Sequence, residues 1–131
     1  MVEKRLIIEM GMGNDMYGQD YTKAAIRAVE SAIRRSSLPL FEGLGLSHDV
    51  MRVAVTIGVQ DPAGVDTAAV AATLPRGRAQ VTATPGGQNV TNPGTGQTIV
   101  IATAAVEAFF PDQSELWRLL PAPAKTDGAP G

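Results

Sequence analysis

The stretch EMGMGNDMYGQDYTKAA, residues 9–25, decides how this chain folds, because it joins a predicted strand to the clearest predicted helix. The apolar run at residues 4–11 ends in glycine and predicts the first strand. Residues 20–38 predict the helix, with Asp20 as N-cap, since a carboxylate there accepts from free amides of the first turn. The helix carries an apolar stripe and, beside it, small residues that allow close approach to a sheet: Ile26, Val29 and Ile33, with Ala25, Ala28 and Ala32.

The rest of the chain continues this alternation of strands and helices. Residues 51–60 alternate as a strand, and a short helix capped by Asp66 ends at Pro75. Strands follow at residues 78–84 and 98–110, separated by a polar loop. The order β-α-β-α-β-β predicts an α+β fold: a four-stranded sheet with helices packed on one face. Further expectations are one domain over residues 1–120, a short helix at 112–120 anchored by Trp117, and a disordered tail rich in Pro, Ala and Gly at 121–131.

The composition is that of a globular protein. Of the 131 residues 44% are hydrophobic and 18% charged, and the formal net charge is −2. No basic stripe with interleaved aromatic residues occurs, which argues against nucleic acid as a partner. No apolar run resembles a signal peptide or reaches membrane-spanning length. The absence of cysteine excludes disulfides and thiolate chemistry. We therefore expect a cytoplasmic protein with no membrane partner.

The opening stretch resembles two phosphate-binding motifs in part, but it lacks residues that each motif requires. Gly11 and Gly13 match the first two positions of Gly-x-Gly-x-x-Gly, but Met16 occupies the third. Gly13 and Gly18 have the spacing of the two glycines of a P-loop. A P-loop continues with lysine and then serine or threonine, whereas this chain continues with a glutamine and an aspartate. The neighbouring carboxylates would also repel an anion at this helix start. The stretch is therefore not predicted to bind phosphate.

A polar cluster is expected where the first strand meets the helix. Lys23 lies in the first helical turn, where the dipole disfavours a cation by about 0.3–1 kcal/mol. A carboxylate from Asp15 or Glu9 would offset this, and such charged pairs can serve proton transfer. In the alternative interpretation Lys23 is a surface lysine, Asp20 only an N-cap and the glycines a tight turn. Tyr17 is either a phenol donor in a pocket or an amphipathic side chain at an interface.

The single histidine and a second glycine pair are the other residues of types that occur in functional sites. His48 is the single histidine and has no ligand-spaced partner, so no metal site and no catalytic role are expected for it. Gly86 and Gly87 follow a strand, where they form a turn or bring backbone amides close to a ligand. No serine lies on a nucleophile-elbow pattern.

The segment GMGNDMYGQDYTKAAIRAV, residues 11–29, resembles the "Lin" family of bacterial and plant conserved hypothetical proteins. The family signature is Gly-x-Gly-x-Asp-x-His-Gly, and VTIGVQDP, VDTAAVAATLPRG and TPGG are also similar to the family, so the resemblance covers residues 4–110. Tyr17 stands where the signature has His. The resemblance implies that any acid–base role of that His is lost here or taken over by a phenol. The residues that match the signature are Gly11, Gly13, Asp15 and Gly18.

A second, purely architectural similarity is to the repeats of cyanuric acid hydrolase and barbiturase, which open cyclic amides where similar units meet. It suggests a ring-like oligomer with pockets between subunits. We expect a small-molecule enzyme or ligand-binding protein with its site at a subunit interface, acting on a cyclic amide or another nitrogenous metabolite. The alternative is a non-catalytic structural or regulatory subunit, assembling with itself or with a His-bearing sibling chain.

The candidate site residues come from the two glycine-containing stretches. Asp15, Tyr17 and Lys23 are the catalytic candidates, with Lys23 as the acid–base or substrate-orienting group and Asp15 as its partner. No metal and no cofactor are expected. The candidates for substrate binding are Gly11, Gly13, Gly18, Gln19, Gly86 and Gly87.

Overall fold

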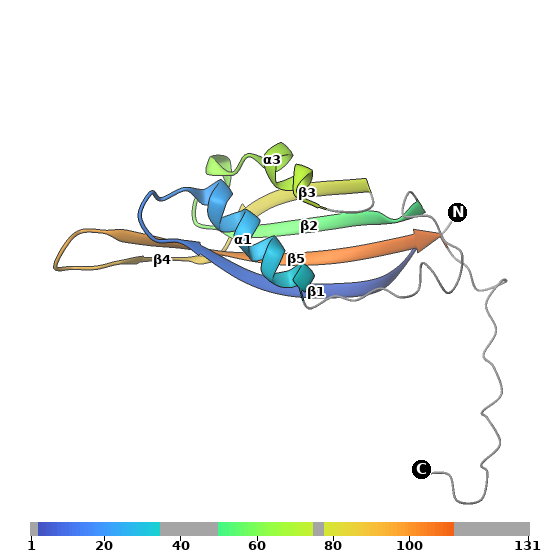
Figure 1. Cartoon of the computed structure of the whole chain (residues 1–131), viewed down its shortest axis with the longest axis horizontal. Coiled ribbons are helices and arrows are strands. Elements are labelled where there is room, and N and C mark those ends of the chain that lie inside the picture. The colour runs from blue at the N-terminus through green and yellow to red at the C-terminus, as the bar shows by residue number, and fades with distance from the viewer. Residues whose placement is uncertain (1–2, 35–49, 75–77, 112–131) are drawn as a thin grey trace, which may run out of the picture.

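A five-stranded sheet covered on one face by helices forms the part of the chain that the computed structural model describes, residues 3–34, 50–74 and 78–111 (Figure 1). This arrangement confirms the predicted α+β class and the packing of helices on one face. None of the helices in the described ranges is long and apolar enough to cross a membrane. The elements are β1 (Glu3–Asp15), α1 (Tyr21–Arg34), β2 (Arg52–Val59), the 3-10 helix η2 (Pro62–Gly64), α3 (Thr67–Ala72), β3 (Arg78–Pro85), β4 (Gln88–Thr91) and β5 (Thr98–Pro111).

The last strand lies at the centre of the sheet. The strand order is β1-β5-β2-β3, and β5 runs antiparallel to both β1 and β2. β2 and β3 are parallel, so the chain between them must cross over the sheet, and it does so through η2 and α3. A register shift between Arg5 and Ile7 marks a bulge in β1. β1 and β2, which flank α1 in the sequence, are thus held together by a strand that comes much later.

The sheet has one strand more than the four predicted. β4 pairs with the start of β5, from Gln88 opposite Ile101 to Thr91 opposite Thr98. The sequence pattern assigned residues 88–97 wholly to a polar loop, because Asn, Pro and Gly are turn formers. Those turn formers mark only the hairpin tip, where Gly96 N donates to Asn92 O over 2.8 Å. The predicted helix at 112–120, the tail at 121–131 and His48 lie outside the described residues.

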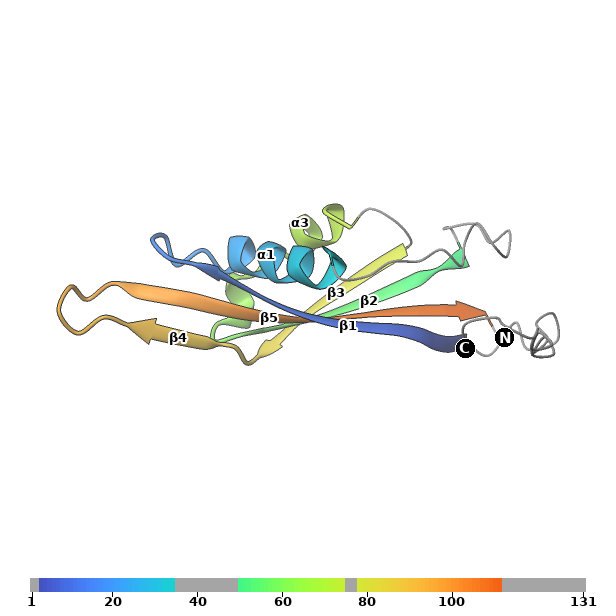
Figure 2. The ribbon, with the colours of Figure 1, turned by 60° about the horizontal axis from the view of Figure 1, so that its bottom comes forward.

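The core lies between the helices and one face of the sheet. Figure 2 shows from a second angle that α1 and α3 lie on the same side of the sheet. The predicted alternation of β2 is confirmed, since Val53, Val55, Ile57 and Val59 are all buried on the helix side. Asp20 accepts from Lys23 N and Asp66 accepts from Ala69 N, so both predicted helix caps are confirmed. The largest fully buried side chain is Phe110. The residues that α1 buries completely are Ala24, Ala25, Ala28, Val29 and Ala32.

Gly11 and Gly13 belong to β1 and not to a turn, whereas Gly18 lies in the turn after β1. Gly11 and Gly13 alternate with exposed Met10 and Met12, and they face α1. A Cβ at Gly13 would overlap the backbone N of Ala28 and lie 2.6 Å from Ala24 O, where real Cβ atoms do not approach. A Cβ at Gly11 would likewise overlap Ala28 O. The strand therefore extends four residues beyond its predicted end, and α1 rests directly on its backbone.

Replacing Gly13 by alanine should separate α1 from β1. Overpacking a closely packed site costs about 1–3 kcal/mol, and we expect the upper end because both neighbours are backbone atoms that cannot rotate away. Urea unfolding of Gly13→Ala measures this loss. Gly94→Ala is the control, because the Cβ there meets only the side-chain oxygen of Asn92, at 3.3 Å. Equal stability of the two variants would contradict the close approach.

Candidate functional site

Asp15 organises the turn that leads from β1 into α1. Its Oδ2 accepts hydrogen bonds from Gly18 N at 3.0 Å and from Asp20 N at 2.9 Å. The side chain is only 7% exposed. A carboxylate that accepts two backbone amides holds the intervening residues in one conformation, including Gln19, whose φ of 48° is left-handed. The last residue of the strand therefore sets where the helix begins.

The same contacts keep Asp15 ionised. The hydrogen bond from Asp20 N lowers the pKa of Asp15, burial opposes this, and the Gly18 amide and the charges of Lys23 and Arg27 lower it further. Asp15 is therefore a carboxylate at neutral pH. It can orient a cation or accept from a ligand N–H, but it holds no proton to donate.

Two cations of α1 face this carboxylate. Lys23 Nζ lies 3.9 Å and Arg27 Nη1 lies 3.8 Å from Asp15 Oδ1. Arg27 also donates to Asn14 O at 2.6 Å, which ties the helix to the end of β1. The two cations are four residues apart and lie on one side of the helix. Lys23 makes no hydrogen bond through Nζ to any described residue, and its side chain is 55% exposed, so its donors are available to a ligand.

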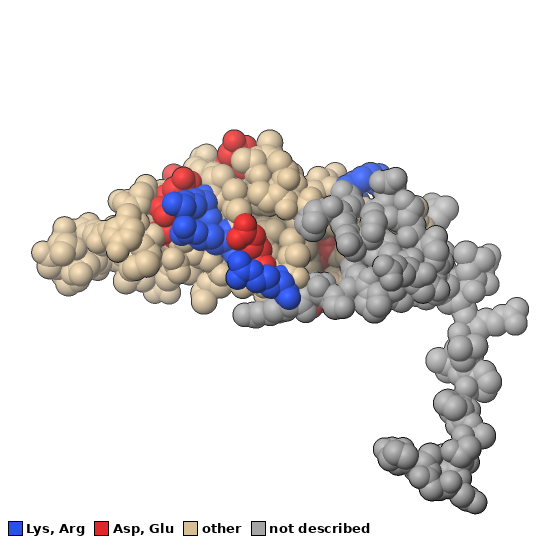
Figure 3. Space-filling view, viewed as in Figure 1, with Lys and Arg blue, Asp and Glu red and all other residues tan. Residues whose placement is uncertain are grey.

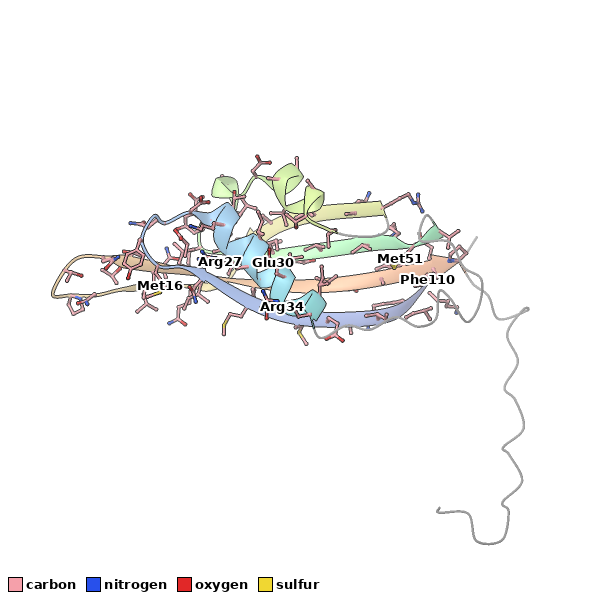
Figure 4. All side chains as sticks on the ribbon, in the orientation of Figure 1. Met16, Arg27, Glu30, Arg34, Met51 and Phe110 are labelled. Carbon is pink, nitrogen blue, oxygen red and sulfur yellow. The ribbon has the colours of Figure 1, made fainter. Side chains whose placement is uncertain are left out.

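These residues enclose an open pocket of about 540 Å³, here called the junction pocket. Figure 4 shows Arg27 on α1 and Met16 on the preceding turn. In Figure 3 the blue Lys and Arg atoms of α1 form a row beside red acidic atoms, so the pocket opens onto a surface of mixed charge. The lining residues are Asn14, Asp15, Met16, Tyr17, Gly18, Asp20, Lys23 and Arg27.

The structure gathers some of the predicted site residues and separates others. Asp15, Tyr17, Gly18 and Lys23 all line the junction pocket, and the predicted Lys23–Asp15 pair is present. Gln19 is exposed and does not line it. Gly11 and Gly13 lie beneath α1, where backbone atoms fill the space above them.

The second glycine pair lies at the junction of β3 and β4, outside the lining of the pocket. Gly86 N donates to Val59 O at 2.9 Å, so this amide already has a partner. Gly87 has a φ of +61°, and a Cβ there would overlap Ile101 O. The carbonyls of both glycines accept from Gln60 Nε2, at 3.1 and 3.4 Å. The described contacts of this pair are those of a tight strand connection.

The lining residues that the sequence did not predict as site residues are Asn14, Met16, Asp20 and Arg27. No site role was predicted for Arg27. Its spacing of four from Lys23 was the available signal, since i and i+4 side chains are neighbours on a helix. The acceptor that draws it inward is the backbone carbonyl of Asn14, and a carbonyl has no signature in sequence.

Within the described ranges, no three His, Cys, Asp or Glu side chains gather as metal ligands. The charged groups of the junction pocket are two cations and two carboxylates. Asp20 is one of these carboxylates, and it is engaged as the cap of α1. The pocket therefore offers donors from Lys23 and Arg27 around a single buried acceptor.

Comparison with known proteins identifies relatives without a known activity. A family described as "Conserved hypothetical protein (Lin0512_fam)" matches residues 5–108. A crystal structure of a protein from Nostoc punctiforme, described as an FtsZ-like protein of unknown function, is 42% identical with a TM-score of 0.75. The match covers 86% of this chain and 99% of that one. No curated protein matches this chain.

The carboxylate of Asp15 should make stability depend on pH. Because its pKa is lowered in the folded state, its contribution is complete above the ordinary value of 3.8 and is lost as pH falls through the folded value. At pH 7, Asp15→Asn should lower the free energy of unfolding by about 1–3 kcal/mol, since hydrogen bonds to a charged group weaken. The difference from wild type should shrink below pH 3.8.

Urea unfolding at pH 7 and at pH 3 measures both effects. Asp61→Asn is the matched control, because Asp61 is exposed and its side chain makes no capping hydrogen bond. A gap between wild type and Asp15→Asn that stays constant over this pH range would show that the charge of Asp15 does not hold the turn.

Proposed function

This chain belongs to the Lin0512 family of conserved hypothetical proteins, and we propose that it is a small-molecule enzyme or ligand-binding protein whose site is the junction pocket. The observation that carries the proposal is the meeting of a buried carboxylate with two partly exposed cations in one pocket. Surface ion pairs contribute little to stability, so stability alone does not account for Lys23 and Arg27 converging on Asp15.

The charges favour a ligand that has carbonyl or carboxylate oxygens next to N–H groups. Lys23 and Arg27 supply donors for oxygens, and an ionised Asp15 supplies an acceptor for an N–H. Amide and ureido groups carry both kinds of atom side by side. We therefore propose cyclic amides and related nitrogenous metabolites as the ligand class.

Within this proposal Lys23 binds or protonates the ligand, because its amine is exposed and lies beside a carboxylate that orients it. Arg27 holds a ligand oxygen while its bond to Asn14 O keeps the guanidinium in place. Tyr17, 80% exposed at the rim, supplies a phenol where the family signature has histidine. A pocket this open needs a further wall, and we propose that a neighbouring subunit provides it.

A thermal-unfolding screen tests this proposal. The panel contains cyclic amides, ureido compounds, amino acids and divalent metals, with wild type and Lys23→Ala. A ligand at about a hundred times its dissociation constant adds about 2.7 kcal/mol, which gives a clear shift. We expect a shift with wild type that is lost in Lys23→Ala and kept in Arg34→Ala. Arg34 is an exposed cation on the same helix, away from the pocket.

A shift that Lys23→Ala retains would place the ligand elsewhere. Silence across the panel would favour the second candidate function, a structural or regulatory subunit that assembles with itself or with a His-bearing sibling. The observation that favours this second candidate is the exposure of Tyr17 and of Met16, which is 45% exposed, on one turn.

In the second candidate function Tyr17 packs against a neighbouring chain. Tyr17→Ala should then break the oligomer, because truncating a large aromatic contact removes a major part of an interface. Native mass spectrometry of wild type and Tyr17→Ala measures this directly. An unchanged mass in Tyr17→Ala, together with a ligand shift in the screen, would set this candidate aside.

A further inference from the structure

The face of the sheet opposite α1 and α3 carries exposed apolar side chains along β1 and polar ones such as Thr56 and Thr82 elsewhere, and within the described residues no helix or strand packs on it (Figures 1 and 2). We call it the open face. On β1 it presents Ile8, Met10 and Met12, which are 44%, 66% and 64% exposed. The register of β5 places Ile101 and Ala105 on the same side, together with Thr103 and Glu107. Exposed apolar surfaces that are contiguous in this way mark interaction sites.

We propose that a second copy of this chain covers the open face, sheet against sheet. The first reason is size. β1 and β5 have 13 and 14 residues, and β2 and β3 have 8 each. At about 3.4 Å per residue and about 4.8 Å between strands, these four strands give a face of about 700 Å². A standard protein interface takes about 600–1,000 Å² from each partner, so a face of this size lies within the range of a stable dimer.

The second reason is the shape of the face, because the side chains that project from it are long on β1 and short on β2. β1 carries the long side chains, whereas the open side of β2 carries Ala54, Thr56 and Gly58. β3 continues this side of the sheet with the longer Gln80 and the shorter Thr82. A twofold axis running along the strands, between two sheets, lays β1 of each copy over the β2 and β3 region of the other. Long and short side chains then fit together, and the contact is the same from both sides, as a closed dimer requires.

The third reason is charge. The charged groups at one end of the face are already neutralised within the chain, by Arg5 with Glu107 at 3.1 Å and by Arg52 with Glu3 at 3.0 Å. Arg52 also lies 4.3 Å above the ring of Phe109. These four charges would therefore meet already paired, whereas Arg78, which the register places beside Arg52, makes no ion pair with a described residue. Methionine side chains also adapt readily to a partner surface.

The open face reaches the rim of the junction pocket. Asn14 follows Met12 on the open side of β1, opposite Ile101, and it also lines the pocket. A second copy on this face would therefore lie next to the pocket and could supply its missing wall. The inference nevertheless stands on the open face alone and does not depend on a ligand.

Native mass spectrometry and light scattering on the full chain test the interface. We expect wild type at micromolar concentration to have at least twice the mass of one chain. Met10→Asp should weaken association about tenfold or more, since it places a charge in an apolar contact on both copies. Ala68→Asp is the control, because it adds the same charge on an exposed position of α3. A wild type that stays monomeric would overturn the inference.

Cysteine cross-linking locates the contact without relying on a destabilising variant, because the chain has no cysteine of its own. Facing sheets lie about 10 Å apart, beyond the roughly 7 Å limit between Cα atoms for a disulfide, so a short bifunctional maleimide serves as the cross-linker and each chain carries one cysteine. Added to a mixture of the Met10→Cys chain with the Thr56→Cys or Thr82→Cys chain, it should give a covalent heterodimer. Met10→Cys with Ala68→Cys should not.

Two results would reject the open face as the interface between copies. One is an oligomer in which neither open-face cysteine pair cross-links, which would mean that the copies meet elsewhere. The other is a monomer that loses stability when the chain is cut after Pro111, which would mean that residues 112–131 cover the face instead. In either case the Lys23→Ala thermal shift still decides whether the junction pocket binds a ligand.

Discussion

The close approach of α1 to β1 is the constraint on which the rest of this structure depends. Gly11 and Gly13 have no side chain on the side that faces the helix. The residues of α1 that pack there are alanines, all fully buried: Ala24, Ala28 and Ala32. Helix and strand are thus in contact through their backbones, without the layer of large side chains that normally separates them. Larger residues on either side would lift the helix away from the sheet. The small residues matter here for the distance they allow and not for the area they bury.

That distance also determines the geometry of the junction pocket. Because α1 begins immediately after β1 and lies directly on it, the turn between them is short, and Asp15 closes the turn with two backbone hydrogen bonds. The first two turns of the helix then pass close to the end of the strand. Lys23 and Arg27 consequently come within 4 Å of a carboxylate that the turn has already buried. One packing constraint therefore accounts both for the tight turn and for the cluster of charges beside it.

The two faces of the sheet differ in how they are completed. The helix side is covered by α1 and α3 of the same chain. Its core consists largely of alanine and valine, and Phe110 is its largest buried side chain. The opposite side has methionine and isoleucine on β1 exposed, although solvent-facing strand positions usually carry polar residues. Exposed apolar side chains of this kind call for a second covering layer, and the described helices cover only the other face. The proposed second copy supplies the other layer by repeating the same surface.

Local features were well determined by the sequence itself. The caps Asp20 and Asp66, the alternation of β2 and the small-residue stripe of α1 depend on neighbours a few positions away, and short-range spacing shows them. The Lys23–Asp15 pair could be anticipated for the same reason, since only a turn separates the two residues. Only the tertiary structure decided that β5 lies between β1 and β2, and that four residues of a polar loop pair as β4. It also brought Arg27 to a backbone carbonyl and set Gly86 and Gly87 apart from the pocket. Those outcomes depend on hydrogen bonds and packing between segments far apart in the chain, and short-range spacing does not show which distant segments will meet.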